Sequence, residues 1–542
     1  MEDYKSKIGT GNLALALGKL YTDPFVIYRE YIQNACDGIE LALRQGLINQ
    51  HEAVISIQID KSEISIKDRG IGVSAFDIGP RLVDVGNSTK WKDGLIGQYG
   101  IGRLIAAQYC QKIIFETSFP GQNLKSILTW DTEKAFELID SHEYDDATAI
   151  IDSVTHIDRQ EASLEEHYFR VRLCGIKPHV DHLIDVQAVR EYVSLIAPVD
   201  YSMEFKEGYV RPALANNPEY EQLYEKERLY KVVINGEDVR KPYSIDVPGK
   251  DANLIQPIFM KFEDPDDGLL GWGWCALNDR IIQMNSVPFR GIRFRKLNMA
   301  VGDANVMANY MKNVSVNYFV GEVFLVNEKI QPTGSRDGFV DSAQKSEFDI
   351  LMKDKAEFLY SLYDRASHMG SQAVDKLTAA YLKKSELTAR LNSTTDASDK
   401  KDIRARIHEQ DKIIETKAGE LIDRKSTLQE TDEGRMIADA VIQTRQSNLE
   451  KKIEDNNSKK NKPKIRKTTI EKLVEKHSSD EKTKEEEPTP EPQDPKMVLL
   501  SKLSREQRTV YQKTCDVIDN EPTLTPSYIE ALKMKILKRI AK

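Results

Sequence analysis

The spacing of apolar residues changes near residue 343, and this change limits what the chain can fold into. Upstream, short stretches that alternate apolar and polar residues are interspersed with stretches of helical period. Downstream, to about residue 450, only the helical period remains. Because the first pattern is typical of strands mixed with helices and the second of helices alone, the sequence predicts an α+β part followed by a helical part.

The first 205 residues combine both kinds of pattern. Alternation predicts strands at 54–60, 63–67, 112–116 and 168–173. Helices are expected at 28–43 and at 102–111, the second one directly after a glycine-rich loop. Strands and helices in this mixture favour a two-layer α/β sandwich.

The remainder of the chain divides by composition. We interpret 206–230 as a linker, 231–342 as a second α/β domain, 343–450 as a helical hairpin or coiled coil, 451–496 as a disordered charged linker and 497–542 as a small helical module. The hairpin prediction depends on Ile407, Ile414, Leu421 and Leu428, which recur every seven residues. A polar turn at 392–398 precedes them.

Charge and cysteine content narrow the possible functions. The 542 residues carry a formal net charge of -9, which argues against a mainly electrostatic binder of nucleic acid. The five cysteines are far apart and contain no Cys-x-x-Cys pair, so neither a disulfide framework nor a zinc site is expected. No stretch reaches the roughly 18 apolar residues of a membrane span. We therefore expect a cytoplasmic protein without a membrane partner.

Three short segments carry polar residues suited to chemistry. In the first, Glu30, Asn34 and Asp37 are spaced i, i+4 and i+7, so a helix places them on one face, where they can hold a cation and position water. In the second, Asp68 ends a strand and precedes Gly70 and Gly72. Those glycines permit a tight turn and close approach of a flat ligand.

The third segment is the glycine-rich loop that contains Gly97, Gly100 and Gly102 and precedes a predicted helix. Free backbone N–H groups at a helix start bind anions, and glycines let phosphates come close. Each segment alone is also typical of a solvated helix face or an ordinary turn. Their order and spacing together are much more specific.

The three segments together resemble the Bergerat nucleotide-binding fold of the GHKL ATPases. The stretch from Leu20 to Asp37 and the phrase from Ile96 to Gly102 look closest to the heat-shock protein 90 (HtpG) branch. The resemblance covers roughly residues 20–110 and continues more weakly to about 345. It implies an ATPase that uses ATP and Mg²⁺.

The resemblance also implies residue roles. Glu30 matches the general base, Asn34 the magnesium ligand and Asp68 the carboxylate that reads the adenine amino group. Gly70 and Gly72 shape that pocket, and Asp37 fits the same motif as Glu30 and Asn34. The matches to the lid hinge and phosphate cradle are Gly97, Gly100 and Gly102, and Lys90 lies where the family often places phosphate or lid contacts. The threonine that usually lines the adenine pocket on a later strand has no evident match.

The second α/β domain adds one site residue through the same resemblance. Arg336, in the segment 331–337, matches a middle-domain arginine that reaches the terminal phosphate, and it should engage only when the two domains dock. Arginine suits this role because its charge is permanent and its fork matches phosphate oxygens. The alternating basic strand 291–296 is interpreted as a solvated strand face, with phosphate contact as the alternative.

Several functions remain open at this stage. The first is an HtpG-like clamp that closes as a homodimer on a protein client, and the second is a MORC-like or MutL-like ATPase in a DNA-related or anti-phage defence process. A nucleotide-binding scaffold with little turnover is the third. For a homodimer, we expect contacts from the Ala- and Leu-rich segment 9–20 and from the seven-residue stripe of the helical hairpin.

Overall fold

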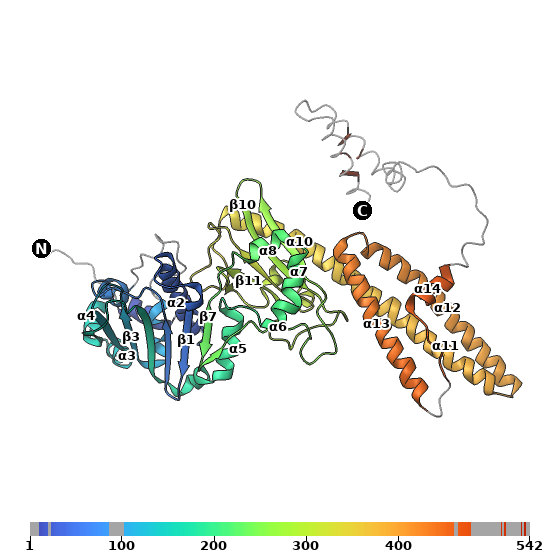
Figure 1. The fold of residues 1–542 in the computed structure, drawn as a ribbon, viewed down its shortest axis with the longest axis horizontal. Coiled ribbons are helices and arrows are strands. Elements are labelled where there is room, and N and C mark those ends of the chain that lie inside the picture. The colour runs from blue at the N-terminus through green and yellow to red at the C-terminus, as the bar shows by residue number, and fades with distance from the viewer. Residues whose placement is uncertain are drawn as a thin grey trace. The chain divides into compact units, whose positions relative to one another are not determined.

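The computed structural model describes residues 10–19, 23–85, 102–459 and 464–478, and Tyr511, Thr514, Cys515, Lys533, Ile536 and Leu537 (Figure 1). Residues 1–474 form one compact unit and residues 475–542 form a second. All described residues of the second unit are helical. All five cysteines are free, as expected. No helix in these described ranges is long and apolar enough to cross a membrane.

The first sheet has eight strands in the order β5-β4-β3-β6-β2-β1-β7-β8. Its strands are β1 (Val54–Ile59), β2 (Glu63–Asp68), β3 (Cys110–Ser118), β4 (Leu124–Asp131), β5 (Thr155–Glu161), β6 (Tyr168–Ile176), β7 (Lys231–Ile234) and β8 (Glu237–Asp238). All neighbours are antiparallel except β1 and β7. The four strands predicted in this region are therefore confirmed.

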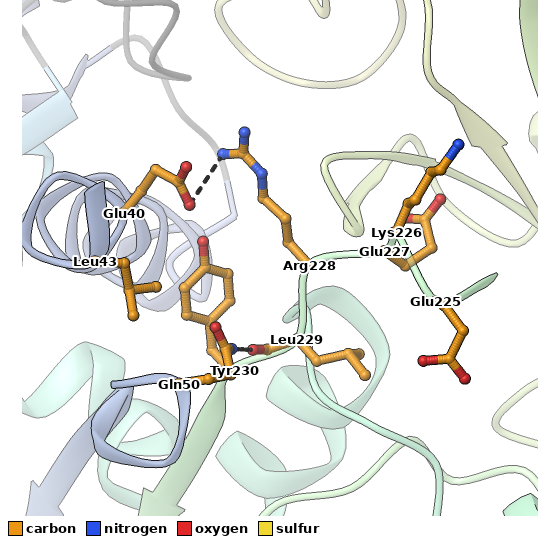
Figure 2. A pocket seen from close by; sticks show the side chains of 9 residues that line it. All are labelled: Glu40, Leu43, Gln50, Glu225, Lys226, Glu227, Arg228, Leu229 and Tyr230. Atoms are coloured by element: carbon orange, nitrogen blue, oxygen red, sulfur yellow. Dashed lines mark hydrogen bonds and ion pairs between the residues drawn. The ribbon is translucent and has the colours of Figure 1, made fainter. Parts of the chain in front are cut away.

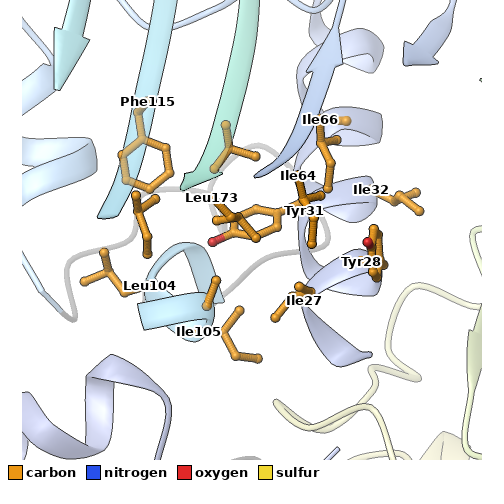
Figure 3. Close-up of a cluster of buried hydrophobic side chains, with 14 of the residues drawn as sticks. Ile27, Tyr28, Tyr31, Ile32, Ile64, Ile66, Leu104, Ile105, Phe115 and Leu173 are labelled. Carbon is orange, nitrogen blue, oxygen red and sulfur yellow. The ribbon is translucent and has the colours of Figure 1, made fainter. Parts of the chain in front are cut away.

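One face of this sheet is covered by helices. Strand β1 buries Ile55, Ile57 and Ile59 while Ser56 and Gln58 are exposed, as a half-covered strand requires. The covering elements are α1 (Thr10–Ala14), α2 (Val26–Arg44), α3 (Thr132–Ser141), α4 (Ala147–Val154), α5 (Val186–Ile196) and a 3₁₀ helix (Gly102–Gln108). Figure 3 shows apolar side chains of α2 facing those of β2, β3 and β6. This part is a two-layer arrangement of helices on a sheet.

One sequence interpretation of the first region is wrong in detail. Residues 231–234 were placed in the second α/β domain, but they form β7, which pairs in parallel with β1 of the first sheet. In segment 9–20, expected to contact a second subunit, Leu13 and Leu17 pack in the first core of this chain. Apolar periodicity identifies a strand or helix without specifying which sheet or core it joins.

The second sheet has five strands in the order β12-β11-β13-β10-β9. They are β9 (Ile258–Asp264), β10 (Gly268–Ala276), β11 (Gly291–Lys296), β12 (Met299–Val301) and β13 (Val320–Leu325). Every residue of β11, β12 and β13 is buried, which marks a sheet covered on both faces. One face contributes to a core shared with the long helices, the other to an aromatic core.

This double cover corrects two further interpretations. The presumed linker 206–230 contains α7 (Arg211–Ala215) and α8 (Pro218–Tyr224), and Tyr209 and Tyr224 pack in the aromatic core with α6 (Met203–Phe205). The basic strand 291–296 has no solvated face: Arg293, Arg295 and Lys296 are all buried. The alternation of charged and apolar residues predicted one water-facing side. This was wrong because the residues that cover both faces come from distant parts of the chain, which a local pattern does not reveal.

The helical part begins at α10 (Ala343–His368) and continues through α11 (Asp375–Ser393), α12 (Ala397–Leu428) and α13 (Asp432–Ser458), as predicted (Figure 1). Ile414, Leu421 and Leu428 of the seven-residue stripe are buried in the core that these helices share with the second sheet. These three side chains therefore pack within their own chain, while Ile407 is half-buried.

The charged segment 451–496 was predicted to be disordered, and this is wrong for its described part. Helix α13 ends at Ser458. The next described segment begins at residue 464 and leads into α14 (Ile470–Ser478). Ile453, Ile465 and Ile470 are buried in the helical core. A few apolar side chains at helical spacing suffice when neighbouring helices supply the rest of the core. Residues 460–463 and 479–496 lie outside the described ranges.

Candidate functional site

Helix α2 presents the first predicted group of polar residues. Glu30 and Asp37 are buried, with 8% and 3% of their surface exposed, and Asn34 is half-buried. A solvated helix face would leave these side chains in water. Because burying carboxylates away from water costs free energy unless they have partners, this face belongs to an internal polar site.

The end of β2 meets the same helix. Asp68 is buried, and its Oδ1 accepts a hydrogen bond of 2.7 Å from the Gly70 N–H. The Ile71 N–H donates to the Gly38 carbonyl of α2 at 3.0 Å. A Cβ on Gly70 would lie 2.5 Å from the Gly38 carbonyl carbon, so only glycine allows this approach. The structure thus brings Asp68 beside the helix that carries Asp37.

Gly72 is held against strand β3. Its φ is +75°, and a Cβ there would lie 2.0 Å from the Ser118 carbonyl oxygen. The buried Thr117 hydroxyl accepts from the Val73 N–H and donates to the Tyr168 carbonyl, both at 2.8 Å. Thr117 was missed because a threonine inside a strand carries no distinctive local signal.

A histidine also lies at this turn. Nδ1 of His167, just before β6, is 2.9 Å from the Gly70 carbonyl oxygen. Thr117 on β3 and His167 just before β6 thus both contact the turn after Asp68. Thr117 is thus a threonine on a later strand beside Asp68, the kind of residue for which the sequence offered no evident match.

Gly102 lies next to Glu30. It begins the 3₁₀ helix Gly102–Gln108, where an α-helix to residue 111 was expected, and β3 already starts at Cys110. A Cβ on Gly102 would lie 2.6 Å from Glu30 Oε2, so the glycine leaves room for this carboxylate. Lys90, Gly97 and Gly100 lie outside the described residues.

Arg336 reaches this site from the second sheet's side. It is 3% exposed, and its φ of +53° places a non-glycine residue in the left-handed region. Among the described residues, its Nη1 and Nη2 have no hydrogen-bond partner. Burial lowers the pKa of Arg336 to about 10, and the nearby Glu30 and Asp37 charges act in the opposite direction. The guanidinium therefore remains charged at neutral pH.

Arg29 links the Arg336 turn to α2. Its Nη2 donates to the Ser335 carbonyl at 2.8 Å and lies 3.5 Å from Glu30 Oε1. Its buried Nε has no partner among the described residues. Arg29 was not singled out from the sequence, because an arginine beside a predicted helix face is ordinary.

A separate cavity of about 400 Å³ lies farther along α2 (Figure 2). Its lining residues are Glu40, Leu43, Gln50, Glu225, Lys226, Glu227, Arg228, Leu229 and Tyr230. The Arg228 guanidinium is 3.4 Å from Glu40, and Gln50 donates to the Leu229 carbonyl at 2.7 Å. None of the predicted site residues that the structure describes lines this cavity.

The chemistry of the site suits a phosphate-bearing ligand with magnesium. Unpaired guanidinium nitrogens bind phosphate oxygens through charge-assisted hydrogen bonds. The Asn34 amide and the neighbouring carboxylates supply oxygen donors, which Mg²⁺ prefers, commonly through one or two side chains plus phosphates. Gly70 and Gly72 keep the backbone beside Asp68 free of Cβ atoms. The residues present therefore fit both groups.

No protein-family model matches the chain. Among curated proteins, it is similar to the chaperone protein HtpG of Rickettsia typhi, with 23% identity over 191 residues, which are 32% of this chain and 30% of the relative. HtpG of Ehrlichia canis is 28% identical over 134 residues, 21% of each chain. HtpG of Rickettsia massiliae is 26% identical over 192 residues, 32% of this chain and 30% of the relative. The chain thus matches less than a third of these relatives, which supports a distant relation to HtpG chaperones over part of its length.

Proposed function

We propose that this chain binds ATP with magnesium and hydrolyses it at the site formed by α2, the end of β2 and Arg336. The observation that carries the proposal is the unpaired, buried Arg336 guanidinium beside Glu30 and Asp37. A buried guanidinium whose Nη1 and Nη2 make no hydrogen bonds is costly, and a polyanionic ligand would remove that cost. The partial similarity to HtpG chaperones supports the same activity.

Each residue has a role in this proposal. Glu30 takes a proton from the attacking water, and Arg336 stabilises the charge that develops on the terminal phosphate. Asn34 would hold Mg²⁺, which neutralises phosphate charge. Asp68 accepts a hydrogen bond from the exocyclic amine of adenine. Asp37 would add a carboxylate beside Asn34 at the magnesium site.

The glycines and Lys90 have supporting roles. Gly70 and Gly72 let the base approach the backbone, and Gly102 leaves space for Glu30. For Gly97, Gly100 and Lys90, the proposed roles in cradling phosphates or in the lid rest on the sequence resemblance alone.

Calorimetry with ATP and magnesium tests the pocket. Asp68→Asn should lose nucleotide binding, because its amide would present a donor to the adenine amine. Glu63→Gln is the matched control, since Glu63 begins the same strand β2 and pairs with Arg172 at 2.8 Å on the sheet. Equal ATP affinity in the Asp68→Asn variant and in the control would refute the assignment.

At the level of the whole molecule, we propose a clamp related to HtpG that closes as a homodimer on a protein client. The proposal rests on the partial similarity. Sedimentation of a Glu30→Ala variant with and without ATP tests it, since trapped ATP should favour the dimer. A monomer under both conditions would exclude the clamp and leave the ATPase proposal standing.

A further inference from the structure

A second group of buried charges joins the two sheets. Glu322 of β13 is fully buried, and it accepts hydrogen bonds from Lys241 Nζ at 2.8 Å, Tyr201 Oη at 2.5 Å and Arg295 Nε of β11. Arg295 and Lys241 are themselves only 1% and 2% exposed. Every charged member of this group therefore has hydrogen-bonded partners.

These partners come from both parts of the molecule. Lys241 follows β8 at the edge of the first sheet, and its backbone N–H donates to the Asp200 carbonyl at 2.9 Å. Arg295 Nη2 donates to the Leu195 carbonyl of α5 at 2.9 Å. A cation at a helix C-terminus is stabilised by the helix dipole. The second sheet is thus bonded to a helix that covers the first sheet.

The β11–β12 hairpin continues this connection. Its turn residue Asn298, with φ of +61°, accepts from Lys241 Nζ and donates to the Arg228 carbonyl, both at 3.0 Å. Arg295 Nη1 donates to the Asn298 carbonyl at 2.8 Å. Met299 and Ala300 of β12 then pack in the first core. The hairpin is therefore fixed against the first sheet by polar and apolar contacts.

Arg336 is attached to the end of this hairpin. Gly302, directly after β12, donates its N–H to the Arg336 carbonyl at 2.8 Å. From the other side, Arg29 of α2 holds the Ser335 carbonyl. A displacement of the β11–β12 hairpin would be transmitted to the Arg336 turn.

We propose that Glu322, Arg295, Lys241 and Asn298 are positioning residues that hold Arg336 at α2 at all stages of the proposed ATPase cycle. This inference rests on the proposed function, because only bound ATP gives Arg336 a terminal phosphate to contact. It replaces the expectation that the arginine engages only when two domains dock. Separating the sheets would expose a shared core and break the bonds of Lys241 to Glu322 and of Arg295 to Leu195.

Turnover in a double-mutant cycle tests the inference. Glu322→Gln should lower kcat on the order of 10²-fold, since a small misplacement of a catalytic group has that effect, with ATP affinity unchanged. In an Arg336→Ala background, the same substitution should cause no further loss, because both act through one group. Glu63→Gln, on the exposed side of the first sheet, should keep wild-type turnover.

Three results would overturn the inference. They are wild-type kcat in a folded Glu322→Gln variant, an equal loss from Glu322→Gln with and without Arg336, and wild-type kcat in Arg336→Ala. If Glu322→Gln does not fold, Asn298→Gly replaces it, since glycine tolerates the positive φ while removing the two side-chain bonds. The same outcomes then apply.

Hydrogen exchange separates this inference from the proposed function. Segment 333–338 should be equally protected with and without ATP in the wild type and less protected in Glu322→Gln, but not in Glu63→Gln. If the wild type neither binds nor hydrolyses ATP, the proposed function fails, whatever the exchange shows. Unchanged protection of segment 333–338 in Glu322→Gln would refute the positioning role even if ATP is hydrolysed.

Discussion

Arg295 and Arg336 are two buried arginines of the same region with opposite surroundings. Both are at most 3% exposed, and both lie near a buried glutamate. Arg295 donates through Nε, Nη1 and Nη2 to Glu322, Asn298 and Leu195, among others. For Arg336, no described residue accepts from Nη1 or Nη2, and its backbone is in the left-handed region.

This difference indicates that Arg295 has a structural role, whereas Arg336 is available to bind a ligand. A buried charge whose hydrogen bonds are complete holds elements together, while breaking such a group is strongly destabilising. A buried cation that lacks partners and sits on strained backbone costs stability in the isolated fold, and such residues cluster at functional sites. Substitutions at the two sites should therefore differ in their effects on turnover and on stability.

The largest effect is expected from Arg336→Ala. Turnover should fall about 10³–10⁵-fold, the range for phosphate-contacting arginines, while ATP affinity stays near wild type. The free energy of unfolding should change little, because no hydrogen bond of Nη1 or Nη2 is lost, although Glu30 and Asp37 lose a nearby opposite charge. Steady-state kinetics, calorimetry and denaturant unfolding measure the three quantities. A marked loss of stability would erase the contrast with Arg295.

Glu30→Ala should have the next largest effect. Hydrolysis should fall about 10²–10⁴-fold as expected for a lost general base, and ATP should still bind. Phosphate release measures the first quantity and calorimetry the second. Turnover close to wild type would remove the reason to place the terminal phosphate between Glu30 and Arg336.

Glu322→Ala addresses the structural side of the comparison. It leaves Arg295 and Lys241 buried without their carboxylate, so the free energy of unfolding should fall by about 3–5 kcal/mol. Glu63→Gln, which disrupts a partly exposed pair with Arg172, should change it by about 1 kcal/mol or less. Denaturant unfolding of both variants makes the comparison. Similar losses in the two would mean that burial adds nothing to the Glu322 network.

The smallest expected effect is a dependence on acid. Burial would raise the pKa of Glu322, but the Arg295 and Lys241 charges outweigh it and hold the pKa at about 2, compared with 4.5 ordinarily. A lowered carboxyl pKa stabilises the fold above pH 4.5, and this contribution of about 3 kcal/mol is lost as the pH falls towards 2. Unfolding measured from pH 4.5 downwards should therefore depend less on pH in Glu322→Gln than in the wild type. An equal dependence would contradict the assignment.

Local patterns predicted individual elements well and their partners poorly. The sequence located β1, β2 and α2 to within two residues, because alternation and helical period are local properties. It misplaced β7, whose partner β1 lies far earlier in the chain. It also read the basic strand β11 as solvated, although α5 and β13 bury its charges. In each case, the error concerns which distant surface covers the element.

The sequence by itself determined that Glu30, Asn34 and Asp37 share a helix face and that Asp68 ends a strand before two glycines. These relations follow from the period of a helix and the turn that glycine permits. Only the tertiary structure decided that the face is buried, that the turn packs on Gly38, and that Arg29 holds the Arg336 turn against the helix. The Arg29–Ser335 contact spans 306 residues, and no local pattern specifies a contact of that range. The bond from Lys241 to Glu322, which joins residues 81 positions apart, is likewise specified by no local pattern.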